Sequence, residues 1–169
     1  MIGRVVGKYK IRDQIGEGGM GVVYRAEHVV LGSPAAVKVL LPRFTKDPVV
    51  LERFFTEAKA ASAIRHIGIT NVYDYGRITN DQAFIAMELL QGEDLTNFLA
   101  RQGKLHPSLA AEIIAQLLSA LNAAHLVGVV HRDLKPETSS SFVTAARPAA
   151  SASRCSTSGS QSSSVIPTV

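Results

Sequence analysis

The sequence predicts an α+β fold, because a strand-rich first part is followed by a part that is helical. Five short runs rich in Val, Ile, Tyr and Phe, most of them bounded by turn residues, are typical of strands. Apolar residues at helical spacing indicate one helix among the strands and two more after Gly92. The 169 residues, 46% of them apolar and 19% charged, suffice for one domain with a buried core.

The first part holds the strands and a helix that separates the third strand from the fourth. Asp47 supplies the N-cap of this helix and Pro48 occupies its first position, where a missing N–H costs nothing. The predicted strands are 9–15, 21–28, 35–40, 69–75 and 82–88. The apolar face of the helix comprises Leu51, Phe54, Phe55, Ala58 and Ala61.

The second part begins with a short helix over 94–101 and continues with a longer one. Its apolar stripe consists of Ile113, Leu117, Leu121 and Ala124. Polar residues such as Glu112 and Asn122 interrupt this stretch, whereas a membrane span needs roughly 20 nearly uninterrupted apolar residues. We therefore expect a core helix and no membrane segment.

Charge, cysteine content and the N-terminus exclude several functional classes. A net charge of +4, from 18 basic and 14 acidic residues, is too small and too scattered to indicate nucleic-acid binding. Cys155 is the single cysteine, so the chain has neither an internal disulfide nor a cysteine zinc site. Residues 1–4 lack the apolar continuation of a signal peptide, so we expect a cytoplasmic protein.

The composition changes sharply after Glu137. Serine makes up 11 of the 32 residues from Thr138 to Val169, and this stretch contains no acidic residue. Such a Ser- and Ala-rich segment cannot form a core, so we expect residues 138–169 to be a disordered tail.

Six residues, Gly16 to Gly21, match the pattern G-x-G-x-x-G, whose missing Cβ atoms let backbone N–H groups approach phosphate oxygens. The pattern alone is weak evidence, because a plain glycine hairpin also fits it. A dinucleotide-binding unit would need a helix directly afterwards and an acid about 20 residues on. The following residues 22–26 look like a strand, and the residue at that distance is Lys38.

Three ordered motifs resemble those of the protein kinase family, in particular bacterial Ser/Thr kinases. They are Gly16 to Val23 for the glycine-rich loop, Ala36-Val37-Lys38 for the strand lysine, and His131-Arg132-Asp133-Leu134-Lys135-Pro136-Glu137 for the catalytic loop. The resemblance covers residues 9–137. It implies a five-stranded antiparallel small lobe with one helix over 9–90 and the start of a truncated helical large lobe over 91–137.

The resemblance implies an ATP site. Lys38 would pair with the α- and β-phosphates and Glu57 would orient it, although Glu57 could instead pair with Arg53 four residues earlier. Asp94 would contact the ribose or, alternatively, cap the short helix. The complete set implied for ATP is Ile15, Gly16, Glu17, Gly18, Gly19, Met20, Gly21, Val23, Ala36, Lys38, Glu88, Leu90 and Asp94, with Glu88 and Leu90 at the hinge.

In the catalytic loop, the resemblance makes Asp133 the base that accepts the proton of a protein substrate hydroxyl. Lys135 would neutralise the phosphoryl group during transfer. His131 would brace the loop as a packed residue. Together with Lys38 and Glu57, Asp133 and Lys135 are the expected catalytic residues.

Two departures from the family concern the metal. Thr138 stands where the family has an asparagine that binds the second magnesium, and no Asp-Phe-Gly follows Asp133. Mg²⁺ is expected for the family, but its ligands are missing here, so no metal-binding residue is assigned. We therefore expect this chain to bind ATP weakly and to be inactive, and whether it is an enzyme stays open.

The hypothesis that we prefer for the break near position 138 is a reading-frame shift, and the alternative is a natural Ser-rich linker. A codon string for Glu-Asn-Ile-Phe-Leu, the usual continuation in the family, encodes Glu-Thr-Ser-Ser-Ser after loss of one base, which is the sequence of residues 137–141. Three hypotheses stand side by side: the N-terminal part of an ATP-dependent Ser/Thr kinase, a pseudokinase module that binds nucleotide or a partner, and a non-functional frameshift product.

Overall fold

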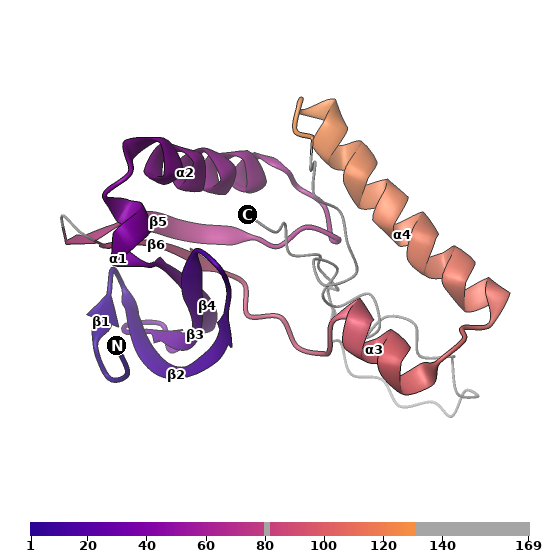
Figure 1. The fold of residues 1–169 in the computed structure, drawn as a ribbon, viewed down its shortest axis with the longest axis horizontal. Coiled ribbons are helices and arrows are strands. Elements are labelled where there is room, and N and C mark those ends of the chain that lie inside the picture. Colours follow the sequence, from indigo (N-terminus) through magenta and orange to yellow (C-terminus); the bar gives the residue numbers. More distant parts are fainter. Residues whose placement is uncertain (80–81, 131–169) are drawn as a thin grey trace. The chain divides into compact units, whose positions relative to one another are not determined.

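The computed structural model describes residues 1–79 and 82–130, which fall into two units along the chain (Figure 1). The first unit comprises residues 1–63 and 71–89, and the second comprises residues 64–70 and 90–130 within the described part. The chain therefore leaves the first unit after its main helix, contributes seven residues to the second, and returns.

A single antiparallel sheet forms the first unit, in the strand order β1-β2-β3-β4-β6-β5. Its strands are β1 (Val5–Val6), β2 (Tyr9–Glu17), β3 (Gly21–His28), β4 (Pro34–Leu40), β5 (Val72–Thr79) and β6 (Gln82–Met87). This confirms the predicted antiparallel sheet with one long helix. The sheet has a sixth strand, β1, because two residues are too short to give a sequence signal.

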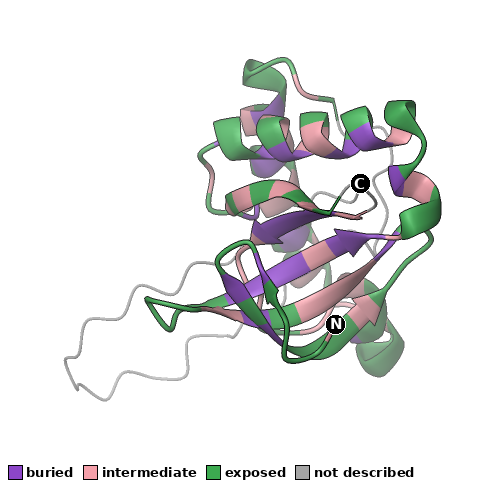
Figure 2. Cartoon of the chain, turned by 90° about the vertical axis from the view of Figure 1, so that its left-hand side faces the viewer, coloured by how far each residue is buried: buried purple, intermediate pink, exposed green. Residues whose placement is uncertain are grey.

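The two faces of the sheet are packed differently, because successive side chains of a strand point to opposite sides. On one face Val37 and Val39 of β4 join a buried cluster with Ile11, Phe84 and other strand residues. On the other face Leu40 of β4 and Ile85 of β6 pack against helix α2. Figure 2 shows buried residues along the central strands and exposed residues at the hairpin turns.

Helix α2 (Pro48–Ala63) is the helix that the sequence predicts, and it runs along the sheet in Figure 1. The Asp47 carboxylate accepts hydrogen bonds from the N–H groups of Val49 at 2.9 Å and Val50 at 3.4 Å, so the predicted N-cap is present. Its residues Leu51, Phe54 and Ala58 are buried against Leu40, Ala83 and Ile85 of the sheet. A short helix that the sequence did not reveal, α1 (Pro42–Thr45), precedes it.

The second unit contains α3 (Leu95–Gln102) and α4 (Pro107–Leu126). Ile64 and Ile69 are buried together with Ile113, Ala120 and Ala124 of α4. Ile69 therefore does not begin a strand, and β5 starts three residues later than predicted. Gly68 lies so close to α4 that an added Cβ would be 3.1 Å from the Cβ of Ala120.

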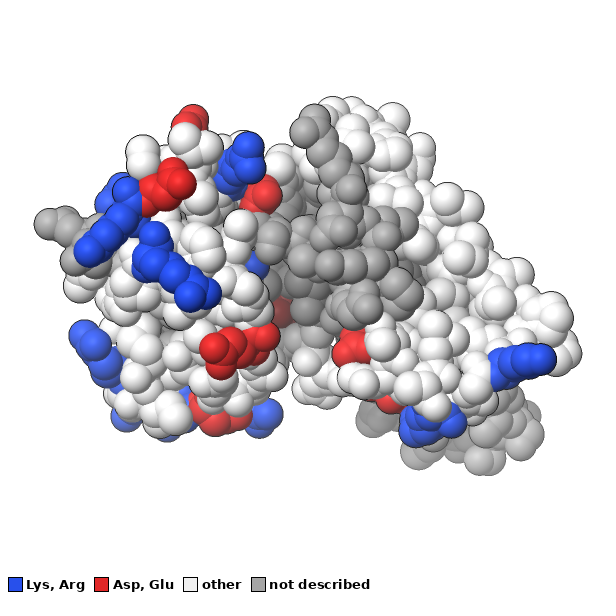
Figure 3. Space-filling view, viewed as in Figure 1, with Lys and Arg blue, Asp and Glu red and all other residues white. Residues whose placement is uncertain are grey.

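Helix α4 is nearly free of charged side chains on the face shown in Figure 3, whereas basic and acidic residues are interspersed over the first unit. By length and composition alone α4 is able to cross a membrane, with a mean hydropathy of 1.4. Core helices of soluble proteins pass the same test when they are mostly buried, whereas only 17% of the apolar window of α4 is buried, with Ile113, Ala120 and Ala124 in a packed cluster.

Candidate nucleotide site

The glycine-rich motif forms the turn between β2 and β3. The N–H of Gly18 donates to the carbonyl of Gly21 at 2.9 Å, which closes the turn. The N–H of Leu41 donates to the carbonyl of Met20, also at 2.9 Å, and so continues the pairing of β3 with β4. The element after the glycines is strand β3, not the helix that a dinucleotide-binding unit requires.

The glycines of this loop are not equivalent. A Cβ at Gly21 would lie 2.6 Å from the carbonyl oxygen of Val39, so packing against β4 requires a glycine there. At Gly18 and Gly19, in contrast, an added Cβ would have no heavy atom within 4 Å. The loop therefore presents a backbone edge bordered by open space, which fits the approach of phosphate oxygens to N–H groups.

Strand pairing places three of the predicted site residues on one face of the sheet. Lys38 of β4 lies directly opposite Val23 of β3, and residues opposite one another in an antiparallel pair share a face. Ala36 lies two residues before Lys38 on the same strand and so points to the same side. This is also the face against which α2 packs.

Lys38 and Glu57 lie within electrostatic reach of each other. Burial lowers the pKa of the Lys38 ammonium, and the charge of Glu57 partly opposes that effect. Burial raises the pKa of the Glu57 carboxyl, while the charges of Lys38 and, to a smaller extent, Arg53 lower it. Of the two partners that the sequence left open for Glu57, Lys38 thus has the larger effect.

One oxygen of the Glu57 carboxylate lacks a hydrogen-bond donor among the described residues. Its Oε2 is buried and accepts no hydrogen bond from the residues that the structure describes. An unsatisfied buried acceptor is costly, and a functional role or a bound water or ion is among the explanations for such an atom. A half-buried lysine beside this carboxylate, on the face of the sheet shared with Val23 and Ala36, fits the polyphosphate of a nucleotide.

Glu88 and Asp94 make local hydrogen bonds that the sequence did not reveal in full. The side chain of Glu88 accepts a hydrogen bond from Asn71 Nδ2 at 3.0 Å, and its N–H donates to the Asn71 carbonyl at 2.9 Å. Asp94 accepts from the N–H of Asn97 at 2.8 Å and from Asn97 Nδ2 at 2.7 Å, so it is the N-cap of α3. Its role toward a ribose stays a prediction.

The predicted catalytic loop and tail lie outside the described residues. This applies to Asp133, Lys135, His131 and Thr138, and to the expected disorder of residues 138–169. Within residues 1–79 and 82–130 there is no group of three or more His, Cys, Asp or Glu side chains that could hold a metal ion.

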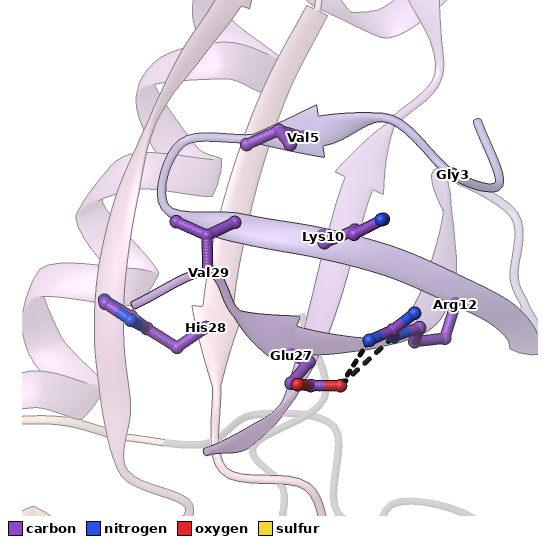
Figure 4. Close-up of a pocket in the computed structure, with 7 residues that line it drawn as sticks. All are labelled: Gly3, Val5, Lys10, Arg12, Glu27, His28 and Val29. Carbon is purple, nitrogen blue, oxygen red and sulfur yellow. Dashed lines mark hydrogen bonds and ion pairs between the residues drawn. The ribbon is translucent and has the colours of Figure 1, made fainter. Parts of the chain in front are cut away.

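A groove of about 490 Å³ lies elsewhere on the first unit, on the outer strands β1 to β3 (Figure 4). An ion pair between Arg12 and Glu27, with a distance of 2.6 Å, runs along its wall. The other residues that line it are Gly3, Val5, Lys10, His28 and Val29. None of the predicted nucleotide-site residues belongs to this groove.

Comparisons with known proteins agree with the motifs. Residues 9–138 match the family described as Protein kinase domain. The serine/threonine-protein kinase PknH of Mycobacterium bovis is 43% identical over 136 residues, which is 80% of this chain and 23% of the relative. The serine/threonine-protein kinase pkn3 of Myxococcus xanthus is 44% identical over 130 residues, 77% of this chain and 24% of the relative. The chain thus spans about a quarter of the length of these relatives.

Solved structures show the same fold. The kinase domain of Mycobacterium tuberculosis PknI superposes with a TM-score of 0.70 and 31% sequence identity, over 82% of this chain and 57% of that one. A double mutant of the same domain superposes with a TM-score of 0.74 over 99% of this chain and 60% of that one, at 26% identity.

Proposed function

This chain belongs to the protein kinase family, and from that premise we propose that it is the ATP-binding part of a Ser/Thr protein kinase. The observation that supports the proposal is a half-buried Lys38, opposite Val23 on the sheet, whose charge and that of Glu57 shift each other's pKa. The activity and substrates of the whole protein are part of the proposal, because the chain spans only a quarter of its relatives.

In this proposal each described residue has a binding role. The Lys38 ammonium donates to oxygens of the α- and β-phosphates, and Glu57 keeps it charged and oriented. The backbone at Gly19, which borders open space, approaches the phosphates, whereas the Gly18 N–H is already bonded to the Gly21 carbonyl. Val23 and Ala36 contact the adenine, whose polar edge is bound by the Glu88 carbonyl and the Leu90 N–H.

Asp133 and Lys135 complete the proposed site. The γ-phosphoryl group of ATP is transferred to the oxygen of a protein hydroxyl, and ADP is the leaving group. Asp133 orients that hydroxyl and takes its proton, while Lys135 places a positive charge near the transferred group. We place this domain in the cytoplasm, as is typical of the family.

Residues 1–169 alone are proposed to bind nucleotide without transferring phosphate. The sequence carries Thr138 at the position of a magnesium ligand and contains no Asp-Phe-Gly after Asp133. One alternative is a pseudokinase module that binds nucleotide or a partner, against which the retained Lys38, Glu57, Asp133 and Lys135 argue. The other is a non-functional frameshift product.

The test is ATP binding by residues 1–169, measured by calorimetry, beside the variants Lys38→Met and Lys10→Met. Lys10 is an exposed lysine of the same sheet and controls for loss of one positive charge. We expect Lys38→Met to lose ATP binding and Lys10→Met to retain it. Equal ATP affinity in all three proteins would refute the site, and robust phosphorylation of a generic protein substrate that depends on Lys38 would refute the inactivity.

A further inference from the structure

The glycine-rich loop is attached to the segment that follows β4. Two consecutive carbonyls near its tip are held from that side: Leu41 N–H donates to Met20 at 2.9 Å, and Arg43 Nη2 donates to Gly19 at 3.2 Å. The Leu41 bond is a backbone contact that many residues could make. The Arg43 bond is a side-chain contact that depends on this particular residue.

Contacts of helix α1 and of the Phe44 ring restrain the Arg43 side chain. Arg43 belongs to α1, and the neighbouring Phe44 packs against the cluster that contains Leu40 and Leu51. The Arg43 guanidinium lies over the Phe44 ring, 4.9 Å from its centroid, in a cation–π arrangement that restricts its movement. A guanidinium restrained in this way holds the Gly19 carbonyl in one place.

We propose that Arg43 is a positioning residue that holds the glycine-rich loop ready for nucleotide phosphates. This inference rests on the proposed nucleotide-binding function of the same loop. An added Cβ at Gly18 or Gly19 would meet no atom within 4 Å, so side-chain packing does little to order the tip. A loop that is ordered before binding loses less conformational entropy when the ligand arrives, which raises affinity.

The same attachment links the loop to the Glu57 helix. Phe44 of α1 and Leu51 and Phe54 of α2 belong to one packed cluster. The helices that carry Arg43 and Glu57 are therefore packed in the same cluster. Arg43 thereby connects two elements that act on the phosphates, the glycine loop and the helix that orients Lys38.

The first measurement needs no nucleotide. The N–H of Gly18 is hydrogen-bonded within the turn, so its hydrogen exchange reports how often the turn opens. We compare residues 1–169 with Arg43→Gln, whose side chain is shorter and uncharged, and with Lys46→Gln, which removes an exposed charge three residues away. Gly18 exchange is expected to accelerate about three- to tenfold in Arg43→Gln and to stay unchanged in Lys46→Gln.

The second measurement compares the affinities for ATP and for adenosine, which has no phosphates. Arg43→Gln is expected to weaken ATP binding by about three- to tenfold and to leave adenosine binding unchanged. Unchanged Gly18 exchange overturns the inference, and weaker ATP binding with unchanged exchange shows that Arg43 acts only through its charge. If the unmodified chain binds neither compound, the proposed function fails, while the exchange result still decides whether Arg43 orders the loop.

Discussion

Replacing Gly21 by alanine should destabilise the chain, while the same change at Gly19 should not. At Gly21 the new Cβ would lie 2.6 Å from the Val39 carbonyl oxygen, 0.8 Å closer than the 3.4 Å at which ordinary contacts begin. Val39 and Leu40 are buried, and Val39 is paired with Val22, so β4 cannot move aside freely. Strain of this kind typically costs about 1–3 kcal/mol.

At Gly19 the physical situation is the opposite. An added Cβ meets nothing within 4 Å, and an alanine reduces the conformational freedom of the unfolded chain. The free energy of unfolding should therefore stay the same or rise by up to about 1 kcal/mol. Gly19→Ala is nevertheless expected to lower ATP affinity, because its methyl group enters the space proposed for the phosphates.

The assay is urea unfolding followed by far-UV circular dichroism, since the sequence has no tryptophan for fluorescence. A loss of 1–3 kcal/mol corresponds to a fall in Tm of roughly 2–12 °C for a chain of this size. Equal stability of the two variants would refute the reasoning, because it would mean that the β3–β4 spacing tolerates a methyl group.

Three further predictions concern the charge of Lys38, the helix cap at Asp94 and the reading frame of the gene. Burial lowers the pKa of Lys38 despite the attraction of Glu57. The charged Lys38 ammonium therefore lowers the free energy of unfolding at pH values below its pKa in the folded chain. This destabilisation disappears above pH 10.5, the ordinary pKa, because lysine is then neutral in both the folded and the unfolded chain. Lys38→Met should therefore raise the free energy of unfolding at pH 7, by an amount that shrinks as the pH approaches 10.5, and a loss of stability in urea titrations would contradict this. Asp94→Ala should cost about 0.5–2 kcal/mol through loss of the α3 cap. Asp94→Ser should keep the cap, so a drop in its ATP affinity would reveal the ribose contact, whereas unchanged affinity would leave Asp94 as a cap alone. Resequencing the gene should restore asparagine at position 138 and an Asp-Phe-Gly downstream, and a sequence with no kinase-like continuation in any frame would refute the frameshift.

The sequence predicted the elements whose signals are local. The N-cap at Asp47 was predictable because Asp followed by Pro is a recognised helix start. The strands around Lys38 were predictable because they are short apolar runs rich in Val and bounded by turn residues. The β1 strand and the α1 helix were missed, since two and four residues are too few for a periodic pattern.

The remaining features depend on distant contacts. Isoleucine is common in strands, but Ile69 is buried with Ile113 and Ala120 and does not belong to β5. The motif around Gly21 indicates phosphate binding and gives no sign that the Val39 carbonyl excludes a side chain there. Arg43 lies outside every motif, so its bond to Gly19 could be found only in three dimensions.

The path of the chain between its two units limits how this protein can be divided. Residues 64–70 lie between α2 and β5 in the sequence, yet Ile64 and Ile69 are buried with residues of α4. A fragment that ends at Leu89 would carry these two isoleucines without their partners, and a single cut cannot release either unit intact. An exchange of the sheet-containing unit between kinases must therefore include the matching residues of α4, or replace Ile64 and Ile69 by polar residues. Otherwise the two isoleucines are exposed to solvent and the recombinant protein is prone to aggregate.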